Sequence, residues 1–414
     1  MLKAWFEIKL WKRILGALVA GALVGLVWGE GAESIRWIGD VFIRLIRMLV
    51  VPLIFTTLVS GVIAMGDPKK LGSIGVKSMV LYMATTALAI TIGLTFGELL
   101  DVGRGVDLTG AEAFQLAEPV GLAERLYGIV PINPVAALAE GNVLAIILFS
   151  ILLGIGILLA GDKARALADV FNAGAEAMLK VTHMVMEIAP FGVFALIASV
   201  AGSGGLETLL SVVALAAAVY GACLTHMILV HGGLVRFLVR LPVLPFFRGV
   251  LDAQLVAYST ASSAATLPVT ISVAENNLGI RQSVASSVLP LGATINMDGT
   301  ALYIGIVTLF AAHAFGIDLD MTDYFMIGLT TTLVSIGTAA VPSASLFLLA
   351  AVLEVIGISA AQTAIVIGFV LPFDRVLDMM RTATNVTGDL AVATAVAKSE
   401  GEFDEACYRA APAE

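Results

Sequence analysis

Charged residues are scarce in this chain of 414 residues. Only 13% of its residues are charged and 59% are hydrophobic, whereas soluble domains carry about 25% charged residues. This shortage excludes an ordinary soluble domain and indicates a polytopic membrane protein. The formal net charge of -9 is summed over loops on two sides of a membrane, so it does not indicate a nucleic-acid partner.

Cysteine is equally scarce. Cys223 lies in an apolar run and Cys407 in the polar C-terminal tail, which excludes a disulfide framework. The N-terminal segment begins with basic residues and becomes apolar without a clear cleavage site. We therefore expect it to be retained as a first membrane span.

Long apolar segments are what the sequence has instead. Eight of them can cross a bilayer, several only with a tilt or a break. They are residues 11–27, 38–65, 76–100, 133–160, 167–200, 206–238, 283–315 and 360–397.

Two further apolar segments, 242–280 and 322–357, are interrupted halfway by small polar residues and a proline. Such residues open the backbone hydrogen-bond ladder, which lipid tolerates only where the break faces protein or a water-filled cavity. We therefore predict two re-entrant helical hairpins whose tips meet near the middle of the membrane.

The two halves of the chain resemble each other. The hairpin with Pro268 precedes a span containing Asn-Met-Asp-Gly-Thr (296–300), and the hairpin with Pro342 precedes a span containing Asn-Val-Thr-Gly-Asp (385–389). Paired interrupted segments indicate a secondary transporter with inverted repeats and a midplane site. The predicted fold class is an all-α polytopic membrane protein with eight transmembrane helices and two re-entrant hairpins.

Basic residues cluster at the N-terminus and in loops that fall on one side of this arrangement, which predicts that both termini are cytoplasmic. Arg36, Arg44 and Arg47 fall on the other side and count against it. The loop over residues 101–133 is then external.

One polar stripe stands out in the last apolar segment. At about 100° per residue, its members fall within roughly a third of the helix circumference. They are Asp378, Arg381, Thr382, Asn385 and Asp389. Because each ionised group at the bilayer centre costs on the order of 3 kcal/mol, the stripe must face protein, water or a ligand.

Arg381 and Asp378 suit a zwitterion with an additional acidic group. A guanidinium matches a carboxylate, and a carboxylate three residues earlier on the same face can bind an ammonium group. The alternative is an ion pair that only neutralises two buried charges. Asp298 and Asp389 have no adjacent basic residue, which suits cation binding; alternatively, each accepts hydrogen bonds from backbone at a helix break.

At residues 296–300 and 381–389 the sequence resembles the dicarboxylate/amino acid:cation symporters, over nearly its whole length. The resemblance implies a homotrimer in the inner membrane with an elevator-like motion. It implies a scaffold and trimerisation domain (11–66 and 133–200), a transport domain (72–100 and 205–398) and a cytoplasmic tail (399–414).

The resemblance also implies the substrate site. Arg381 would bind the side-chain carboxylate, and Asp378 with Thr382 the amino group. Asn385 and the hairpin-tip residues Ser262 and Ser263 would hold the α-carboxylate. The remaining substrate-site residues are Ala261, Thr300 and Val341.

The resemblance also implies three cation sites. Because this sequence has the residue types that the family uses at all three sites, sodium is favoured over protons as the coupling ion. The first comprises Asp389, Gly292, Asn296 and Asn385. The second comprises Thr294, Ser335, Ile336 and Thr338. The third comprises Asp298, Asn296, Thr85, Thr86 and Tyr82.

Two positions depart from the family pattern. Mammalian relatives place a glutamate, the proton carrier, where this chain has Ile304. Archaeal relatives have an arginine at the first hairpin tip, where this chain has Ala261. Arg375 can take over that role or pair with Asp374.

We therefore expect a sodium-coupled symporter that imports aspartate or glutamate, with no enzymatic cofactor. Alternatives are a proton-coupled symporter, a C4-dicarboxylate carrier, an ion channel and an intramembrane hydrolase. The hydrolase would need a nucleophile beside a base, and no such pattern is present. The histidines, expected to be span or interface residues, have no metal-ligand spacing beyond one i,i+5 pair. They are His183, His226, His231 and His313.

Overall fold

The protein is helical throughout the part that the computed structural model describes, namely residues 8, 10–64, 68–104, 106, 130–336 and 344–410. No strand occurs within these ranges, and one isolated bridge pairs Ile280 with Phe403. The predicted all-α class is thereby confirmed.

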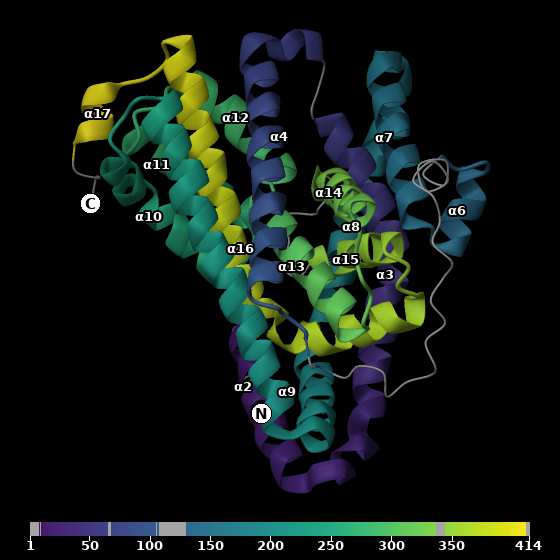
Figure 1. Cartoon of the computed structure of the whole chain (residues 1–414). Coiled ribbons are helices and arrows are strands. Elements are labelled where there is room, and N and C mark those ends of the chain that lie inside the picture. The colour runs from purple at the N-terminus through teal and green to yellow at the C-terminus, as the bar shows by residue number, and fades with distance from the viewer. Residues whose placement is uncertain are drawn as a thin grey trace.

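Figure 1 shows the order of the elements along the chain. The first group is α2 (Leu10–Trp28), η1 (Gly29–Ile35), α3 (Arg36–Ala64), α4 (Pro68–Leu99), α6 (Pro134–Glu140), α7 (Val143–Ala160), η2 (Gly161–Ala164), α8 (Arg165–Met186) and α9 (Ala189–His226). The second group is the π-helical turns η3 (Met227–His231) and η4 (Leu234–Leu238), then α10 (Val243–Thr260), α11 (Ser263–Asn276), α12 (Gln282–Ile295), α13 (Asp298–Ala314), α14 (Met321–Ile336), α15 (Ala344–Val355), α16 (Ala360–Glu400) and α17 (Glu405–Arg409).

Several helices have the length and composition of membrane spans. Four segments of the described chain qualify, and shorter apolar helices accompany them at Val51–Ile63, Ala189–Gly202 and Ala360–Leu371. The four are Lys12–Phe42, Ser73–Leu99, Val213–Leu238 and Gln282–Ala314.

The structure divides the fifth and sixth predicted spans differently from the sequence. We expected a break between residues 200 and 206, but α9 continues through this stretch, and the helix is interrupted at residues 187–188 instead. Near this interruption Glu187 pairs with the buried Arg13 of α2, with 2.8 Å between Oε2 and Nη1.

The first predicted hairpin is present as two helices, α10 and α11, that pack on each other and on α16 (Figure 1). Its turn is short. Ala261 ends α10 in the left-handed conformation (φ 50°, ψ 41°), which is strained for a residue other than glycine. Ser262 then caps α11 by accepting a hydrogen bond from Ala265 N. Pro268 lies inside α11 rather than at the break, so the small polar residues alone make the turn.

The second predicted hairpin comprises α14 and α15, which also pack on each other. Its tip lies outside the described residues, and with it Thr338, Val341 and Pro342. Ser335 and Ile336 form the last turn of α14.

The predicted span 283–315 is interrupted at its motif. Helix α12 ends at Ile295 and α13 starts at Asp298, so Asn296 and Met297 link them in a non-helical conformation. Every residue in the most apolar stretch of α12 and α13 is buried, so protein covers this break. Unwound backbone in such a place exposes carbonyl groups to a bound cation.

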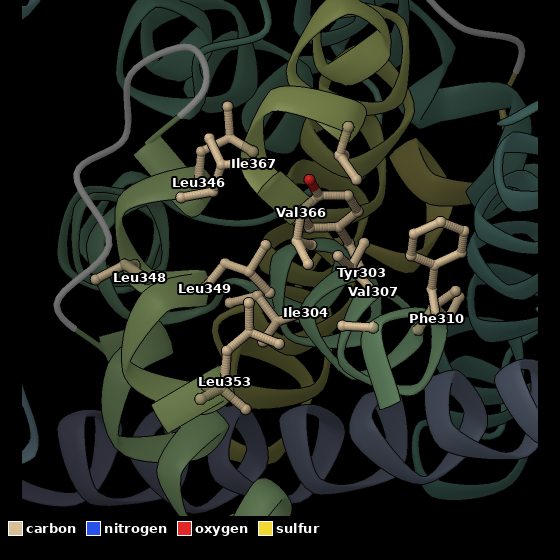
Figure 2. Close-up of a cluster of buried hydrophobic side chains, with 14 of the residues drawn as sticks. Tyr303, Ile304, Val307, Phe310, Leu346, Leu348, Leu349, Leu353, Val366 and Ile367 are labelled. Atoms are coloured by element: carbon tan, nitrogen blue, oxygen red, sulfur yellow. The ribbon is translucent and has the colours of Figure 1, made fainter. Parts of the chain in front are cut away.

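An apolar cluster holds α13 in place, and Figure 2 shows it between α13, α15 and the first part of α16. Ile304, Val307 and Phe310 of α13 belong to it, as do Leu349 and Leu353 of α15. Ile304 is fully buried in this cluster. An apolar side chain in close packing therefore occupies the position where the family resemblance places a glutamate in mammalian relatives.

Candidate functional site

The polar stripe of α16 is buried, as its composition required. The exposed fraction of its residues does not exceed 7%, and Arg381 is fully buried. Helix α16 forms because Ser359 and Gln362 make a capping box at its start and Gly401 ends it with φ 74°. The stripe is therefore presented on one long, well-terminated helix.

Arg381 is the centre of an ion cluster. Its Nη2 lies 2.8 Å from Asp378 Oδ1 and 3.0 Å from Asp374 Oδ1, and its Cζ lies 3.9 Å from the centre of the Tyr303 ring. Two carboxylates and an aromatic face compensate the cost of burying one guanidinium. The ion pair between Asp378 and Arg381, which the sequence offered as the alternative to substrate binding, is therefore present, together with two partners that the sequence did not indicate.

Two of the three guanidinium nitrogens of Arg381, Nε and Nη1, are available to donate hydrogen bonds to a ligand. Among the described residues, none accepts a hydrogen bond from its Nε or Nη1. Nε–H and the N–H groups of Nη1 lie on different edges of the guanidinium, so each can donate a separate charge-assisted hydrogen bond to a carboxylate oxygen. The arrangement can therefore bind a carboxylate while Nη2 stays on the two aspartates.

Arg375 resolves one alternative that the sequence left open. Its Nη2 donates to the carbonyl of Thr260, the last residue of α10, at 3.1 Å, whereas the carboxylate of Asp374 pairs with Arg381. Arg375 thus reaches the first hairpin tip from α16. The tip residues Ala261, Ser262 and Ser263 are all buried.

Asn385 ties α16 to the break between α12 and α13. Its Oδ1 accepts from Gly299 N at 2.8 Å, and its Nδ2 lies 3.2 Å from Met297 Sδ. Thr300 lies in the first turn of α13 and Thr382 beside Arg381 on α16, and both are buried. Of the expected substrate residues, Val341 alone lies outside the described part of the chain.

The residues expected for the first cation site meet around Asp389. Asn296 Nδ2 donates to Asp389 Oδ1 at 3.0 Å. A Cβ built at Gly292 would lie 2.6 Å from the same oxygen, so only glycine allows this approach. Asn385 lies one turn earlier on α16.

The residues expected for the third cation site also converge. Thr86 Oγ1 lies 2.8 Å and Thr85 Oγ1 3.4 Å from Asp298 Oδ1. Thr85 Oγ1 also lies 3.4 Å from Asn296 Oδ1 and 3.1 Å from the carbonyl of Tyr82. This concentration of oxygen atoms is the donor set that a hard cation prefers. Asp298 lies in the first turn of α13, where the helix dipole favours a negative charge.

For the second cation site, the structure describes only part of the set. Thr294 lies in the last turn of α12, and its hydroxyl donates to the carbonyl of Pro290 at 3.2 Å. Ser335, near the end of α14, donates to the carbonyl of Thr332 at 2.9 Å. Thr338 lies in residues 337–343, which are outside the described part of the chain.

Two histidines lie in a span, as expected, but they also contact a residue of the site, which the sequence did not indicate. His226 and His231 are fully buried, and each places Nε2 on Asp298 Oδ2, at 3.2 and 3.0 Å. Residues five apart lie about 140° from each other on an α-helix, so the spacing concealed them. The π-helical turn η3 brings them together, and the pair of glycines after His231 is the only local signal of an irregular helix.

A broken, buried helix, a hairpin tip and clustered carboxylates with an available guanidinium define an integral membrane transporter of the secondary type. The sequence profile of the sodium:dicarboxylate symporter family matches residues 10–399, and the chain belongs to this family.

Known relatives cover nearly the whole chain. It is 38% identical over 413 residues to the proton/glutamate-aspartate symporter of Escherichia coli K12, covering 95% of this chain and 93% of the relative. It is 34% identical over 407 residues to the proton/sodium-glutamate symport protein of Geobacillus stearothermophilus, covering 95% of each. It is 33% identical over 411 residues to the C4-dicarboxylate transport protein of Rhodopseudomonas palustris BisB18, covering 97% of this chain and 90% of the relative.

Proposed function

We propose that this protein is a sodium-coupled symporter that imports aspartate or glutamate across the inner membrane. In this proposal it is a homotrimer with both termini in the cytoplasm. Residues 72–100 and 205–398 form the part that moves, in an elevator-like manner, against a scaffold of residues 11–66 and 133–200. The boundary between the two parts then lies within α9, which must bend near residues 200–205 during the motion. The packing of α10, α12 and α13 against α16 supports one coherent moving body.

The single observation that carries the proposed substrate is the Arg381 cluster. Nε and Nη1 of Arg381 have no acceptor among the described residues, and each can donate a charge-assisted hydrogen bond to a substrate carboxylate. Asp378 lies 2.8 Å from the same guanidinium and can bind the substrate ammonium group on the same helix face. A substrate with a carboxylate about two carbons from an amino group fits both.

Sodium coupling is supported by the two oxygen clusters beside the substrate site. Asn296 contributes to both of them, since it donates to Asp389 and lies near Thr85. Asn385 connects this region to Gly299 at the start of α13. Sodium bound here would order the non-helical link between α12 and α13 and so position the polar stripe of α16 for substrate. Thermodynamic linkage then requires that sodium raise the affinity for substrate and that substrate raise the affinity for sodium.

A C4-dicarboxylate is the second candidate, because one group of relatives carries that name. Such a substrate has no ammonium group and leaves Asp378 without a counter-charge from the ligand. Proton coupling is the corresponding alternative for the driving ion, since the names of other relatives include it.

The test is uptake into proteoliposomes with sodium and proton gradients imposed separately. We expect an inward sodium gradient to drive uptake of labelled aspartate or glutamate at equal pH on both sides. If uptake instead follows the pH gradient and needs no sodium gradient, the coupling ion is the proton and not sodium. If unlabelled succinate inhibits the uptake of the labelled amino acid as strongly as unlabelled aspartate does, the substrate class is a C4-dicarboxylate and not an amino acid.

A further inference from the structure

The Asp298 carboxylate is bound differently at its two oxygens. Oδ1 faces the hydroxyl groups of Thr85 and Thr86, at 3.4 and 2.8 Å. Oδ2 faces Nε2 of His226 and His231, at 3.2 and 3.0 Å. The hydroxyl side belongs to the proposed cation site, whereas nothing in the proposed function uses the imidazole side.

The geometry of the imidazole pair is well defined. The rings lie edge to face, with centroids 4.6 Å apart and an interplanar angle of 85°. Both rings are fully buried, and among the described residues no group bonds to either Nδ1. An ionised carboxylate only accepts hydrogen bonds, so each imidazole must carry its hydrogen on Nε2. The two N–H groups therefore occupy the lone pairs of Oδ2.

Helix α16 closes the cluster from a third side. A Cβ built at Gly388 would lie 2.9 Å from His231 Nε2 and 3.1 Å from Asp298 Oδ2. The backbone of α16 thus packs directly on the contact between imidazole and carboxylate. With Asp298 and both imidazoles fully buried, bulk solvent does not replace these donors.

We propose that His226 and His231 are positioning residues for the third cation site. By holding Oδ2, they fix the rotation of the Asp298 carboxylate and direct Oδ1 toward the cation that Thr85, Thr86 and Asn296 would share. This inference rests on the proposed sodium coupling. Groups that orient a metal-binding side chain typically change metal affinity 10- to 100-fold when removed.

The test compares donor-retaining with donor-lacking variants of the full-length protein in detergent. Gln places its amide N–H near the position of Nε2, whereas Leu has no donor. The first readout is stabilisation of the protein by sodium without aspartate, measured as melting temperature against sodium concentration. The second readout is the sodium concentration that gives half-maximal aspartate binding.

We expect His231→Leu to raise the half-saturating sodium concentration about 10- to 100-fold, and His231→Gln to stay within about threefold of the parent. Aspartate affinity at saturating sodium should be the same in both. His313→Leu is the matched control, because His313 bonds to the carbonyl of Val102 instead, and its sodium response should equal that of the parent.

A His231→Leu variant with parental sodium affinity would overturn the inference. Equal losses in the Leu and Gln variants, together with zinc binding by the parent, would also overturn it, because the imidazoles would then be direct metal ligands. If His231→Leu does not fold, His231→Asn replaces it. The shorter Asn amide does not reach Oδ2, so a response like that of the Gln variant would contradict the inference.

Failure of the proposed function gives a different result. In that case sodium would not stabilise even the parent, or Asp298→Asn would keep the parental sodium response. Loss of sodium response in Asp298→Asn with no change in His231→Leu rejects the role of the histidine alone.

Discussion

The available half of the Arg381 guanidinium allows a sharp test of substrate recognition. Arg381→Lys keeps the positive charge beside Asp374 and Asp378 but replaces the planar fork with a single ammonium group. The buried carboxylates therefore remain neutralised, and the variant avoids the 3–5 kcal/mol cost of leaving a buried charge unpaired. A loss of affinity then reports the missing fork.

The expected magnitude follows from the contacts. Nη2 of Arg381 is occupied by Asp374 and Asp378, which leaves Nε and Nη1 for the substrate carboxylate. A lysine that stays on the aspartates loses at least one of these two charge-assisted bonds. Each contributes about 1.5–3 kcal/mol, so aspartate affinity should fall about 10- to 150-fold.

The assay is aspartate binding by isothermal titration at saturating sodium, beside binding of serine, which has no side-chain carboxylate. We expect serine affinity to change much less than aspartate affinity. Arg13→Lys is the control, because Arg13 is also buried and paired with a carboxylate, Glu187, away from the site. If Arg381→Lys bound aspartate within threefold of the parent, the assigned role of Arg381 would be wrong.

Three further predictions address the cation site, the packing and the C-terminal tail. Asp389→Asn should raise the sodium concentration for half-maximal aspartate binding at least about tenfold, because a cation loses its charged ligand; unchanged sodium dependence would remove this residue from the site. Gly388→Ala should destabilise the protein by about 1–3 kcal/mol by overpacking, seen as a lower melting temperature, whereas Gly156→Ala, with no atom within 4 Å of the new Cβ, should not. Hydrogen bonds from Lys398 and Arg409 hold the pKa of Glu405 below its ordinary value, so the support for α17 is present at neutral pH and is lost as pH falls through that lowered pKa. The protection factors of α17 amides, that is, exchange rates corrected for intrinsic exchange at each pH, should fall as Glu405 is protonated in acid, and this fall should be absent in Glu405→Gln; protection factors that do not change with pH in the parent would refute this.

Much of the site could be predicted, because the free-energy cost of placing a charged residue in lipid depends on the helix that carries the residue and not on the rest of the fold. Charges on an apolar helix are expensive in lipid wherever the helix lies, so Asp378, Arg381 and Asp389 had to be buried in protein, and they are. The small polar residues around Ala261 likewise broke the first hairpin where expected.

Other partners could not be predicted, because they depend on how distant segments approach one another. Tyr303, which lies against Arg381, comes from another helix. Asp374 is different, because it lies two turns before Arg381 on the same face of α16 and helical periodicity alone places it there. The break expected between residues 200 and 206 is absent, since α9 runs without interruption from Ala189 to His226.

The sequence by itself determined that this is a helical membrane protein whose charged residues on apolar helices must be buried, because periodicity and the cost of charge in lipid act along the chain. Its motifs at residues 296–300 and 381–389 indicated the family by resemblance. Only the tertiary structure decided which groups hold each charge. A π-helical turn changes the helix register and brings His226 and His231 to one carboxylate, a juxtaposition that no regular period could reveal.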